Sequence, residues 1–391
     1  MSFANVAITI LHSFKESVEY NLEEVLPSLS TRVVTGSAFS QRRYQVSSKF
    51  FKALSMLPYG YYQNMDKRTW NGHLLLAGDG STLNLPISKQ VREDFGVHST
   101  TSHGVDRCLS RIFFVYDVLN SFVVDAQFSH MDDGEKTLLN NSLQSLKGQQ
   151  GLFLLDRNFG YFSSLKQLTT HGQHFCIRLS VDASHFTKRV MANDGKDFII
   201  DWKPSRTEYQ TCKKHLLDTL PIKVRVVKVV LESGETELLV TSLLDQQKYP
   251  AQQMKELYHL RWGVEECFKN LKPKMKIEYF GCKKTEGILQ EFHAHIFMLN
   301  MIGLVAREAQ KEIETQCVKR KRSYQYNWKN AFRYLRKSLT ALLSQTENIG
   351  QIIGLLIEQV ARSKIAIIPN RTFSRGNRPS KKTKQITQYN K

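Results

Sequence analysis

Four side chains able to bind a metal ion or a phosphate recur at helical spacing within fifteen residues. They are Tyr258, Arg261, Glu265 and Lys272. At about 100° per residue they fall on one stripe about 60° wide. A carboxylate is a ligand for a hard cation, Arg and Lys hold phosphate oxygens, and a phenol donates a hydrogen bond. The stretch could therefore serve a reaction at a phosphate group.

The same stretch carries a second, apolar stripe, rotated about 80° from the first, as in a helix docked on a core. Its members are Leu257, Leu260, Val264, Phe268 and Leu271. Pro273 is expected to end the helix just after Lys272. Since any surface helix shows a polar stripe beside an apolar one, this geometry alone leaves a purely structural interpretation open.

The spacing Tyr-x2-Arg-x3-Glu-x6-Lys resembles the signature of the DDE transposases of the bacterial insertion-sequence superfamily, and all four positions match. The resemblance extends over about residues 35–385. It implies that Glu265 is the third metal-binding carboxylate, with two aspartates upstream. It also implies that Tyr258, Arg261 and Lys272 contact phosphates around a terminal nucleotide.

Two aspartates follow apolar runs that are typical of buried strands. Asp79 comes after 73–77 and lies between Gly78 and Gly80, where the glycines would leave room for a metal and a phosphate. Asp156 comes after 151–155, and the family's Arg-Asn-Phe-Gly follows it. We expect Asp79, Asp156 and Glu265 to be the catalytic, metal-binding set. A turn aspartate at 79 and a helix-capping aspartate at 156 are the structural alternatives.

Three carboxylates suit a pair of Mg²⁺ ions, with Mn²⁺ as a substitute, because hard cations prefer oxygen ligands. Two such ions activate an attacking oxygen and stabilise the leaving oxygen of a phosphodiester. With water attacking, the product is a nick with a 3′ hydroxyl. With that hydroxyl attacking a second duplex, it is strand transfer. The sequence contains no phosphate-binding G-x-x-x-x-G-K-[ST] loop, so no nucleotide cofactor is expected.

The order of the surrounding elements predicts an α/β fold. A strand at 73–81, a hairpin of strands at 111–119 and 122–128, a helix at 135–146 and a strand at 151–155 give βββαβ. This order begins a ribonuclease-H-like core with a mixed sheet, in which the aspartates meet at one edge. Glu265 lies 109 residues beyond Asp156, so a β-strand insertion is expected between them, as in the family.

Six segments follow from this interpretation. They are a helical N-terminal DNA-binding domain at 1–70, the first part of the catalytic core at 71–179, the β-rich insertion at 180–246, the second part of the core with the signature helix at 247–310, a C-terminal helical region at 311–365, and a basic flexible tail at 366–391.

The N-terminal segment includes two short helices joined by a turn between residues 35 and 54, an order that resembles a helix-turn-helix. Arg42 and Arg43 on the first helix favour DNA contact, although two such helices also occur in scaffolding domains. No Asp or Glu occurs from Ala361 to Lys391, where nine Lys and Arg recur. That composition favours a flexible tail that contacts DNA, with a solubilising tail as the alternative.

Composition is consistent with a nucleic-acid partner. The 391 residues carry 55 Lys and Arg against 36 Asp and Glu, a net charge of +19, and 41% are hydrophobic. An excess of this size suggests a polyanion. The longest apolar run, near 294–306, is too short for a membrane span, and no secretory signal is visible, so we expect a protein of the bacterial cytosol, associated with the nucleoid. Six scattered cysteines are expected to be reduced thiols.

Other candidate ligands are expected to be structural. The remaining acids are Asp117, Asp125, Asp132, Asp133, Glu135 and Glu266. The first two fall in hairpin strands, the next three at a helix entrance, and Glu266 points about 100° away from the polar stripe. His293 and His295 would face opposite sides of a helix. Trp202 could stack on an unpaired base, but a core tryptophan is the ordinary case.

The leading hypothesis is a transposase that cleaves DNA at the terminal inverted repeats of a mobile element and joins them to target DNA. It would act as a homodimer, because two ends must be brought together. A ribonuclease-H-fold nuclease or resolvase without strand transfer is one alternative. A DNA-binding regulator derived from a transposase is the other. The repeat sequence, the target preference and the cleavage intermediate lie outside what the sequence determines.

Overall fold

The computed structural model describes residues 1–14, 16–99, 106–146, 148–181, 184–231, 234–344 and 348–368. The chain forms two compact units. The sheet unit takes in 65–83 and 110–269, and the helical unit takes in the described residues within 1–64, 84–109 and 270–391. Both units are assembled from segments far apart in the chain, so they do not coincide with the six consecutive segments predicted from the sequence. Of the predicted basic tail, only residues 366–368 fall within the described part.

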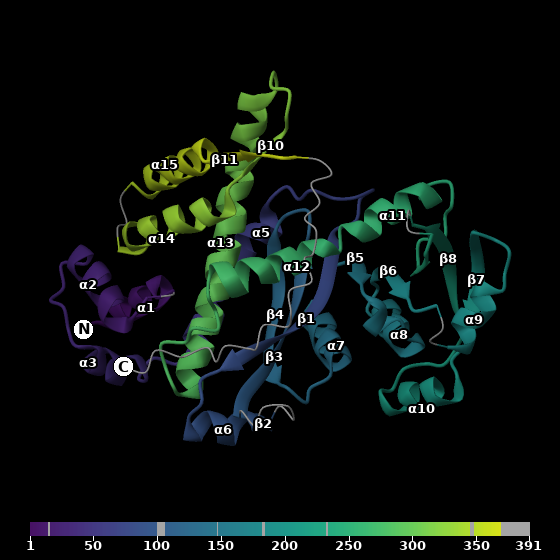
Figure 1. Ribbon diagram of the computed structural model, residues 1–391, viewed down its shortest axis with the longest axis horizontal. Coiled ribbons are helices and arrows are strands. Elements are labelled where there is room, and N and C mark those ends of the chain that lie inside the picture. The colour runs from purple at the N-terminus through teal and green to yellow at the C-terminus, as the bar shows by residue number, and fades with distance from the viewer. Residues whose placement is uncertain are drawn as a thin grey trace. The chain divides into compact units, whose positions relative to one another are not determined.

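The sheet unit is built on a large mixed sheet (Figure 1). Its strands are β1 (Leu75–Leu85), β3 (Asp106–Asp117), β4 (Phe122–His130), β5 (Leu152–Leu155), β6 (His174–Leu179), β7 (Asp197–Trp202), β8 (Ile222–Val230) and β9 (Thr236–Thr241). The strands run in the order β2-β3-β1-β5-β6-β9-β8-β7, where β2 is the two-residue strand His98–Ser99, and β4 also pairs with β3. β1–β5 and β5–β6 are parallel, whereas β3–β4 is the antiparallel hairpin that the sequence predicts.

The central position of β5 follows from its composition. All four of its residues are apolar and each is 0% exposed, which is typical of a parallel strand covered on both faces. The helices of this unit are α7 (Glu135–Ser145), the 3₁₀ turn η1 (Arg157–Phe159), α8 (Phe162–Thr170), α9 (His185–Met191), α10 (Arg206–Lys214), α11 (Ala251–His259) and α12 (Trp262–Lys269). Helix α7 packs on β4 and α8, as its leucines at 138, 139 and 143 require.

The segment 180–246, predicted as a β-rich insertion, contains two helices as well as three strands. Its last strand, β9, pairs antiparallel with β6 from Cys176 opposite Thr241 to Leu179 opposite Leu238. The inserted strands therefore continue the same sheet on the side of β6 that faces away from β5, and they do not form a separate sheet. Trp202 is 3% exposed and stacks on Phe186 with ring centroids 3.9 Å apart, so it is a core side chain.

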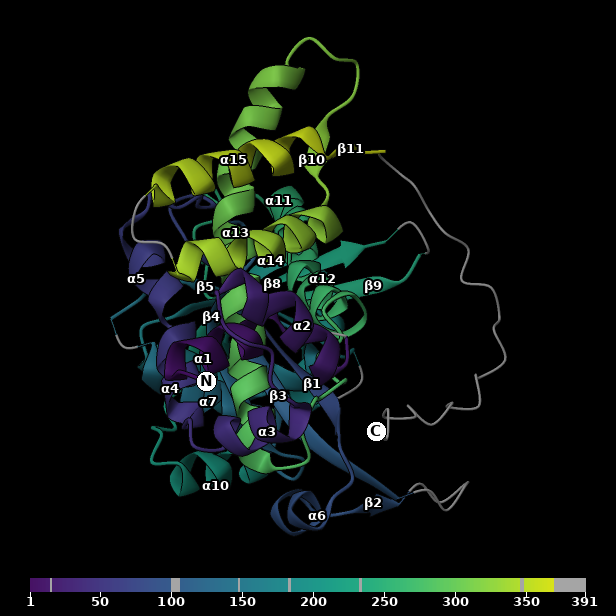
Figure 2. The same cartoon turned by 90° about the vertical axis from the view of Figure 1, so that its left-hand side faces the viewer.

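The helical unit is organised around the long helix α13 (Thr285–Cys317), which α1, α4, α5, α6, α14 and α15 all contact (Figure 2). The other elements are α1 (Phe3–His12), α2 (Val18–Ser28), α3 (Gly36–Arg43), α4 (Ser48–Ser55), α5 (Leu57–Asn64), α6 (Lys89–Phe95), β2 (His98–Ser99), the π-helical segment η2 (Asn270–Lys274), β10 (Tyr324–Tyr326), α14 (Trp328–Ser344), α15 (Ile349–Arg362) and β11 (Lys364–Ala366). Among the described residues, α13 alone is long and apolar enough to cross a membrane, yet 78% of its apolar window is buried, as in a core helix.

Candidate active site

Asp79 and Asp156 stand opposite each other on neighbouring parallel strands. The β1–β5 register pairs Leu75 with Leu152 and Ala77 with Leu154. The same offset, continued two residues further, brings Asp79 opposite Asp156. Adjacent strands lie about 4.8 Å apart, and residues two apart share a face, so both carboxylates project on the same side. The sheet thus brings together the two aspartates that the sequence nominated.

The two aspartates differ in their local setting. Asp156 directly follows β5 and caps η1, its Oδ1 accepting a hydrogen bond from the Asn158 N–H at 2.9 Å. Asp79 lies inside β1, which runs on to Leu85, so the strand extends beyond its predicted end at residue 81 and does not stop near the aspartate. The reason is that β1 has two neighbours. Its pairing with β5 extends from Leu75 to Ala77, and β3 flanks its other side.

The glycines beside Asp79 have a packing role. A Cβ on Gly78 would lie 2.7 Å from Leu155 Cδ2, and one on Gly80 would lie 2.5 Å from Glu135 Oε1. The expectation that these glycines leave room for a metal and a phosphate is therefore not what the structure favours. Their hydrogens face protein side chains, and one of those side chains is itself a carboxylate near the aspartates.

Glu265 and Asp79 are linked through Arg261. The Arg261 Nη2 donates to Glu265 Oε1 at 2.6 Å, and its Nη1 lies 3.9 Å from Asp79 Oδ2. Arg261 is 8% exposed, so its charge sits in a largely desolvated position between two carboxylates. Helix α12 thus delivers Glu265 to the sheet edge that carries the aspartates.

The predicted continuous helix from 258 to 272 is interrupted. Helix α11 ends at His259 and α12 begins at Trp262, and between them the backbone N–H groups of Leu260 and Arg261 bond three residues back. Bonding to i−3 tightens the turn and changes the direction of the side chains. Tyr258 consequently lies 5% exposed in the core, with the Arg261 guanidinium 5.9 Å from its ring centre, and burial raises the pKa of its phenol. It does not share the polar stripe.

Lys272 falls in the π-helical segment η2, which groups with the helical unit. In that segment the Met275 N–H bonds to the Asn270 carbonyl five residues back at 2.9 Å, and the segment continues through Pro273. Burial lowers the pKa of the half-buried Lys272 ammonium. Its place beside the three carboxylates stays a prediction.

The electrostatics of the site are those of crowded carboxylates. Burial, and then the charge of Asp156, raise the pKa of Asp79 to about 7, while Arg261 and the Gly80 N–H act against the rise. Burial and Asp156 also raise the pKa of Glu135, against Arg111 and Asn158. Like charges held this close favour a bound cation, since a cation would relieve their repulsion.

Glu135 was expected from the sequence to have only a structural role, but the fold places it close to the aspartates. It is the first residue of α7, and both its contact with the Gly80 position and its interaction with Asp156 arise from the tertiary fold. The only local signal was an acid at a helix start, which is common for its favourable interaction with the helix dipole. Within the described residues, no three His, Cys, Asp or Glu side chains lie close enough to form a metal-binding group. Two of the three carboxylates, those of Asp79 and Glu265, contact Arg261.

The other acids have structural partners. Asp117 accepts hydrogen bonds from the N–H groups of Leu119 and Asn120 at 3.2 Å and closes the hairpin turn. Asp125 accepts from Ser142 Oγ at 2.6 Å. The remaining pairs are Asp133 with Ser129, Asp132 with His130, and Glu266 with Lys269. His295 is buried and contacts the carbonyls of Glu291 and Met275, which fits the expectation that it forms no metal pair with His293.

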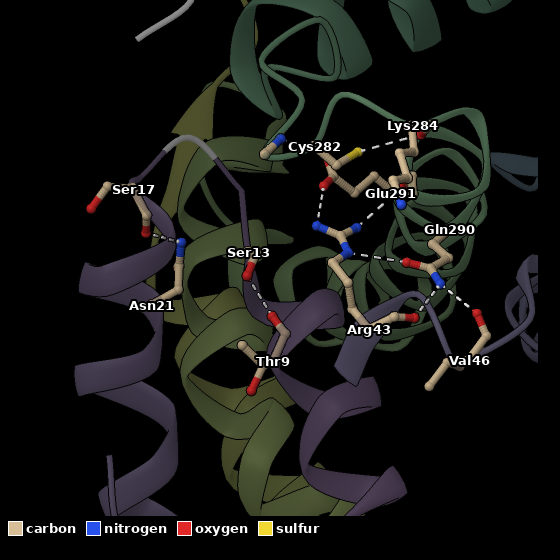
Figure 3. A network of polar contacts seen from close by, with 12 residues as sticks. Thr9, Ser13, Ser17, Asn21, Arg43, Val46, Cys282, Lys284, Gln290 and Glu291 are labelled. Carbon is tan, nitrogen blue, oxygen red and sulfur yellow. Dashed lines mark hydrogen bonds and ion pairs between the residues drawn. The ribbon is translucent and has the colours of Figure 1, made fainter. Parts of the chain in front are cut away.

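The two arginines of the predicted helix-turn-helix have different environments. Helices α3 and α4 form where the sequence predicts them, and Arg42 is exposed at the end of α3. Arg43 is 3% exposed and turns inward to α13, where its Nη1 lies 3.0 Å from Glu291 Oε1 and its Nε donates to Gln290 Oε1 at 3.1 Å (Figure 3). Its guanidinium is therefore satisfied inside the protein.

Comparison with known proteins identifies one family whose model matches the chain. The model of a protein family described as "Transposase DDE domain" matches residues 70–301, a range that contains Asp79, Asp156 and Glu265. No curated protein matches the chain. A solved structure described as a piggyBac transposase synaptic complex with hairpin DNA is similar, with a TM-score of 0.48 and 10% identity over 95% of this chain and 77% of that chain.

Proposed function

Because the chain belongs to the family of transposases with a DDE domain, and is therefore a DNA-cleaving enzyme, we propose that it cuts DNA at the ends of a mobile element and transfers those ends to target DNA. The observation that supports this most directly is the β1–β5 register, because its offset, continued two residues beyond Ala77 and Leu154, pairs Asp79 with Asp156. The contact of Arg261 with both Asp79 and Glu265 adds the third carboxylate to the same edge.

The fold supports a ribonuclease-H-like core. Three strands, of which the second and third form an antiparallel pair, then a helix and a fourth strand parallel to the first appear here as β1, β3, β4, α7 and β5. In this arrangement 71–179 and 247–310 form the core, and 180–246 is the insertion. We keep 1–70 as a DNA-binding domain, 311–365 as a helical region and 366–391 as a basic tail.

The donor set fits divalent cations, because Asp79, Asp156 and Glu265 offer only carboxylate oxygens, and burial and then the charge of Asp156 raise the pKa of Asp79. Mg²⁺, with Mn²⁺ as a substitute, would supply activation of the attacking oxygen and stabilisation of the leaving oxygen when bound. Arg261 holds Asp79 and Glu265 toward each other and keeps a positive charge next to them. The cap that Asp156 forms on η1 fixes the direction of its second oxygen.

Contacts to DNA phosphates are assigned to Arg261, Lys272 and the exposed Arg42. Arg261, like Tyr258 and Arg43, would first have to leave a buried position to make such a contact. The partners are double-stranded DNA of the terminal inverted repeats and of the target, and a second copy of the chain in the synaptic complex. The buried character of α13 is consistent with a soluble protein, and we place it in the bacterial cytosol, at the nucleoid.

The test is incubation of the purified protein with duplexes carrying the candidate inverted repeats that flank its reading frame, plus Mg²⁺ or Mn²⁺. We expect end cleavage and joining. Asp156→Ala should lower the rates of cleavage and joining by about 10³-fold or more and leave DNA binding intact, because a metal site that lacks one of its carboxylates cannot stabilise the leaving oxygen. Asp132→Ala, at a carboxylate whose side chain is 84% exposed, is the matched control and should cut normally.

Three results would contradict the proposal. Undiminished cleavage by Asp156→Ala would remove that residue from the site. Nicks that are never joined to a second duplex would favour a nuclease or resolvase. Binding of the ends without any cleavage by the wild-type protein would favour a regulator.

A further inference from the structure

A cluster of four consecutive basic residues, Lys319 to Arg322, forms a loop between α13 and β10. All four side chains are exposed. None forms an ion pair with a carboxylate in the part of the chain that the structure describes, in contrast to Lys311 on α13, which pairs with Glu308. Figures 1 and 2 both show the end of α13 and this loop projecting beyond α14 and α15. We call residues 319–322 the basic loop.

The basic loop is held at both ends. Gln310 on α13 donates from Nε2 to the Tyr324 carbonyl at 3.0 Å and accepts from the Tyr326 N–H at 3.2 Å. Strand β10 then pairs antiparallel with β11, with Tyr324 opposite Ala366. The Arg320 guanidinium lies 5.1 Å from the centre of the Tyr324 ring. A loop anchored in this way loses less conformational entropy when it binds a partner.

Helix α14, which follows β10, carries a second group of cations on one face. Lys329, Arg333 and Lys337 are spaced at i, i+4 and i+8 and are all exposed. The opposite face is buried through Ala331, Phe332, Leu335 and Leu339. We call residues 329, 333 and 337 the basic stripe. Arg336 is excluded from it, because its Nη2 donates to Asn21 and Glu24 within the unit.

The charged residues of this surface are all basic. Residues 315–344 contain eight Lys and Arg and no Asp or Glu. Cations at i and i+4 on a helix are separated by about 6 Å along its axis, close to the axial rise of about 6.8 Å between alternate phosphates of one DNA strand. A rigid polyanion with regularly spaced charge therefore fits the surface, and no acidic residue among these positions would repel it.

We propose that the basic loop and the basic stripe bind the phosphate backbone of duplex DNA without reading its sequence, at a place separate in the chain from the DDE residues and from the predicted helix-turn-helix. This rests on the proposed function, because DNA is taken as the partner. Such contacts position a duplex rather than select one, so they would hold element ends and unrelated DNA equally well.

The test measures binding of duplex DNA by fluorescence anisotropy across a salt series in EDTA, where no cleavage occurs. Each phosphate contact contributes about 0.9 to the slope of log K against log [salt]. Replacing Lys319, Arg320, Lys321 and Arg322 with Gln should reduce the slope by up to about 3.6, and replacing Lys329, Arg333 and Lys337 with Gln by up to about 2.7. The reduction should be the same for repeat-containing and unrelated duplexes.

The matched control changes four exposed cations of the sheet unit to Gln, namely Lys203, Arg206, Lys213 and Lys214. This control alters the net charge as much as the loop variant does, and it should change the slope by less than about 0.9, the contribution of one phosphate contact. Because all the replaced side chains are exposed, the variants should melt like the wild type.

Equal slopes for the loop variant and the wild type, or an equal reduction in the control, would overturn the proposal. So would an unchanged duplex slope accompanied by a loss of binding to an RNA hairpin of the same length. A wild-type protein that never cleaves element ends but shows the expected slopes would refute the proposed function and leave this inference standing.

Discussion

The burial of Arg43 leads to a measurable prediction about which arginine of α3 stabilises the fold and which contacts DNA. Arg43 donates to Glu291 Oε1 at 3.0 Å, to Gln290 Oε1 at 3.1 Å and to the Gly287 carbonyl at 3.3 Å. The side chains of Arg43 and Glu291 are 3% and 5% exposed. Arg43→Met would leave the Glu291 carboxylate buried, with the Gly281 N–H still donating to its Oε2 at 3.1 Å.

The expected cost is set by that uncompensated charge. Breaking a buried ion pair by removing one partner costs about 3–5 kcal/mol, far more than the loss of a neutral hydrogen bond. We expect Arg43→Met to lower the free energy of unfolding of the helical unit by this amount, measured by urea denaturation. The double variant Arg43→Met/Glu291→Gln should recover about 1–2 kcal/mol, because Gln removes the charge and still accepts the Gly281 hydrogen bond.

Arg42 provides the matched control. It is exposed on the same helix, and its Nη1 donates only to Gln45 Oε1, at 2.5 Å. Arg42→Gln should weaken DNA binding and leave the free energy of unfolding within about 0.5 kcal/mol of the wild type. If Arg43→Met instead weakens DNA binding while unfolding at the wild-type urea concentration, the structural role assigned to Arg43 is refuted.

Four further predictions follow from individual contacts. Burial and then Arg336 lower the pKa of His12 to about 4, so between pH 6.5 and 4 the unfolded chain binds a proton that the folded chain does not. His12 therefore contributes stability that is present above pH 6.5 and falls by about 1.4 kcal/mol per pH unit as the pH is lowered, and urea titrations should show a shallower fall for His12→Asn. Gly78→Ala should cost about 1–3 kcal/mol, since its Cβ would meet Leu155 at 2.7 Å and Phe113 at 3.2 Å, whereas Gly134→Ala, with nothing within 4 Å, should unfold at a urea concentration close to that of the wild type. Arg261→Met should cost about 1–3 kcal/mol, less than Arg43→Met, because Asp79 and Glu265 are 21% and 30% exposed; a larger loss would show that the site is more desolvated than these exposures imply. All six cysteines are buried free thiols, so a thiol reagent should titrate six groups rapidly in denaturant and few in the folded protein, and six rapid reactions with the folded protein would contradict this burial.

Short-range pattern was sufficient for the elements that carry the candidate residues. The apolar run before Asp156 predicted β5, the two β-rich runs around Asn120 and Ser121 predicted the β3–β4 hairpin, and the leucines after Glu135 predicted α7. In each case the determining residues are neighbours in the chain, so periodicity and turn chemistry record the local structure directly. The spacing of Arg261 and Glu265 likewise anticipated their contact one helical turn apart.

The sequence by itself thus determined an α/β protein, the family signature, and which acids to examine. Only the tertiary structure decided that Asp79 faces Asp156, that Glu135 joins them, and that Tyr258 and Arg43 point inward while Arg42 does not. Those outcomes depend on strand register between residues 77 positions apart and on packing of α3 against α13. A change of one residue in register reverses which side chains share a face, and no local pattern encodes that choice.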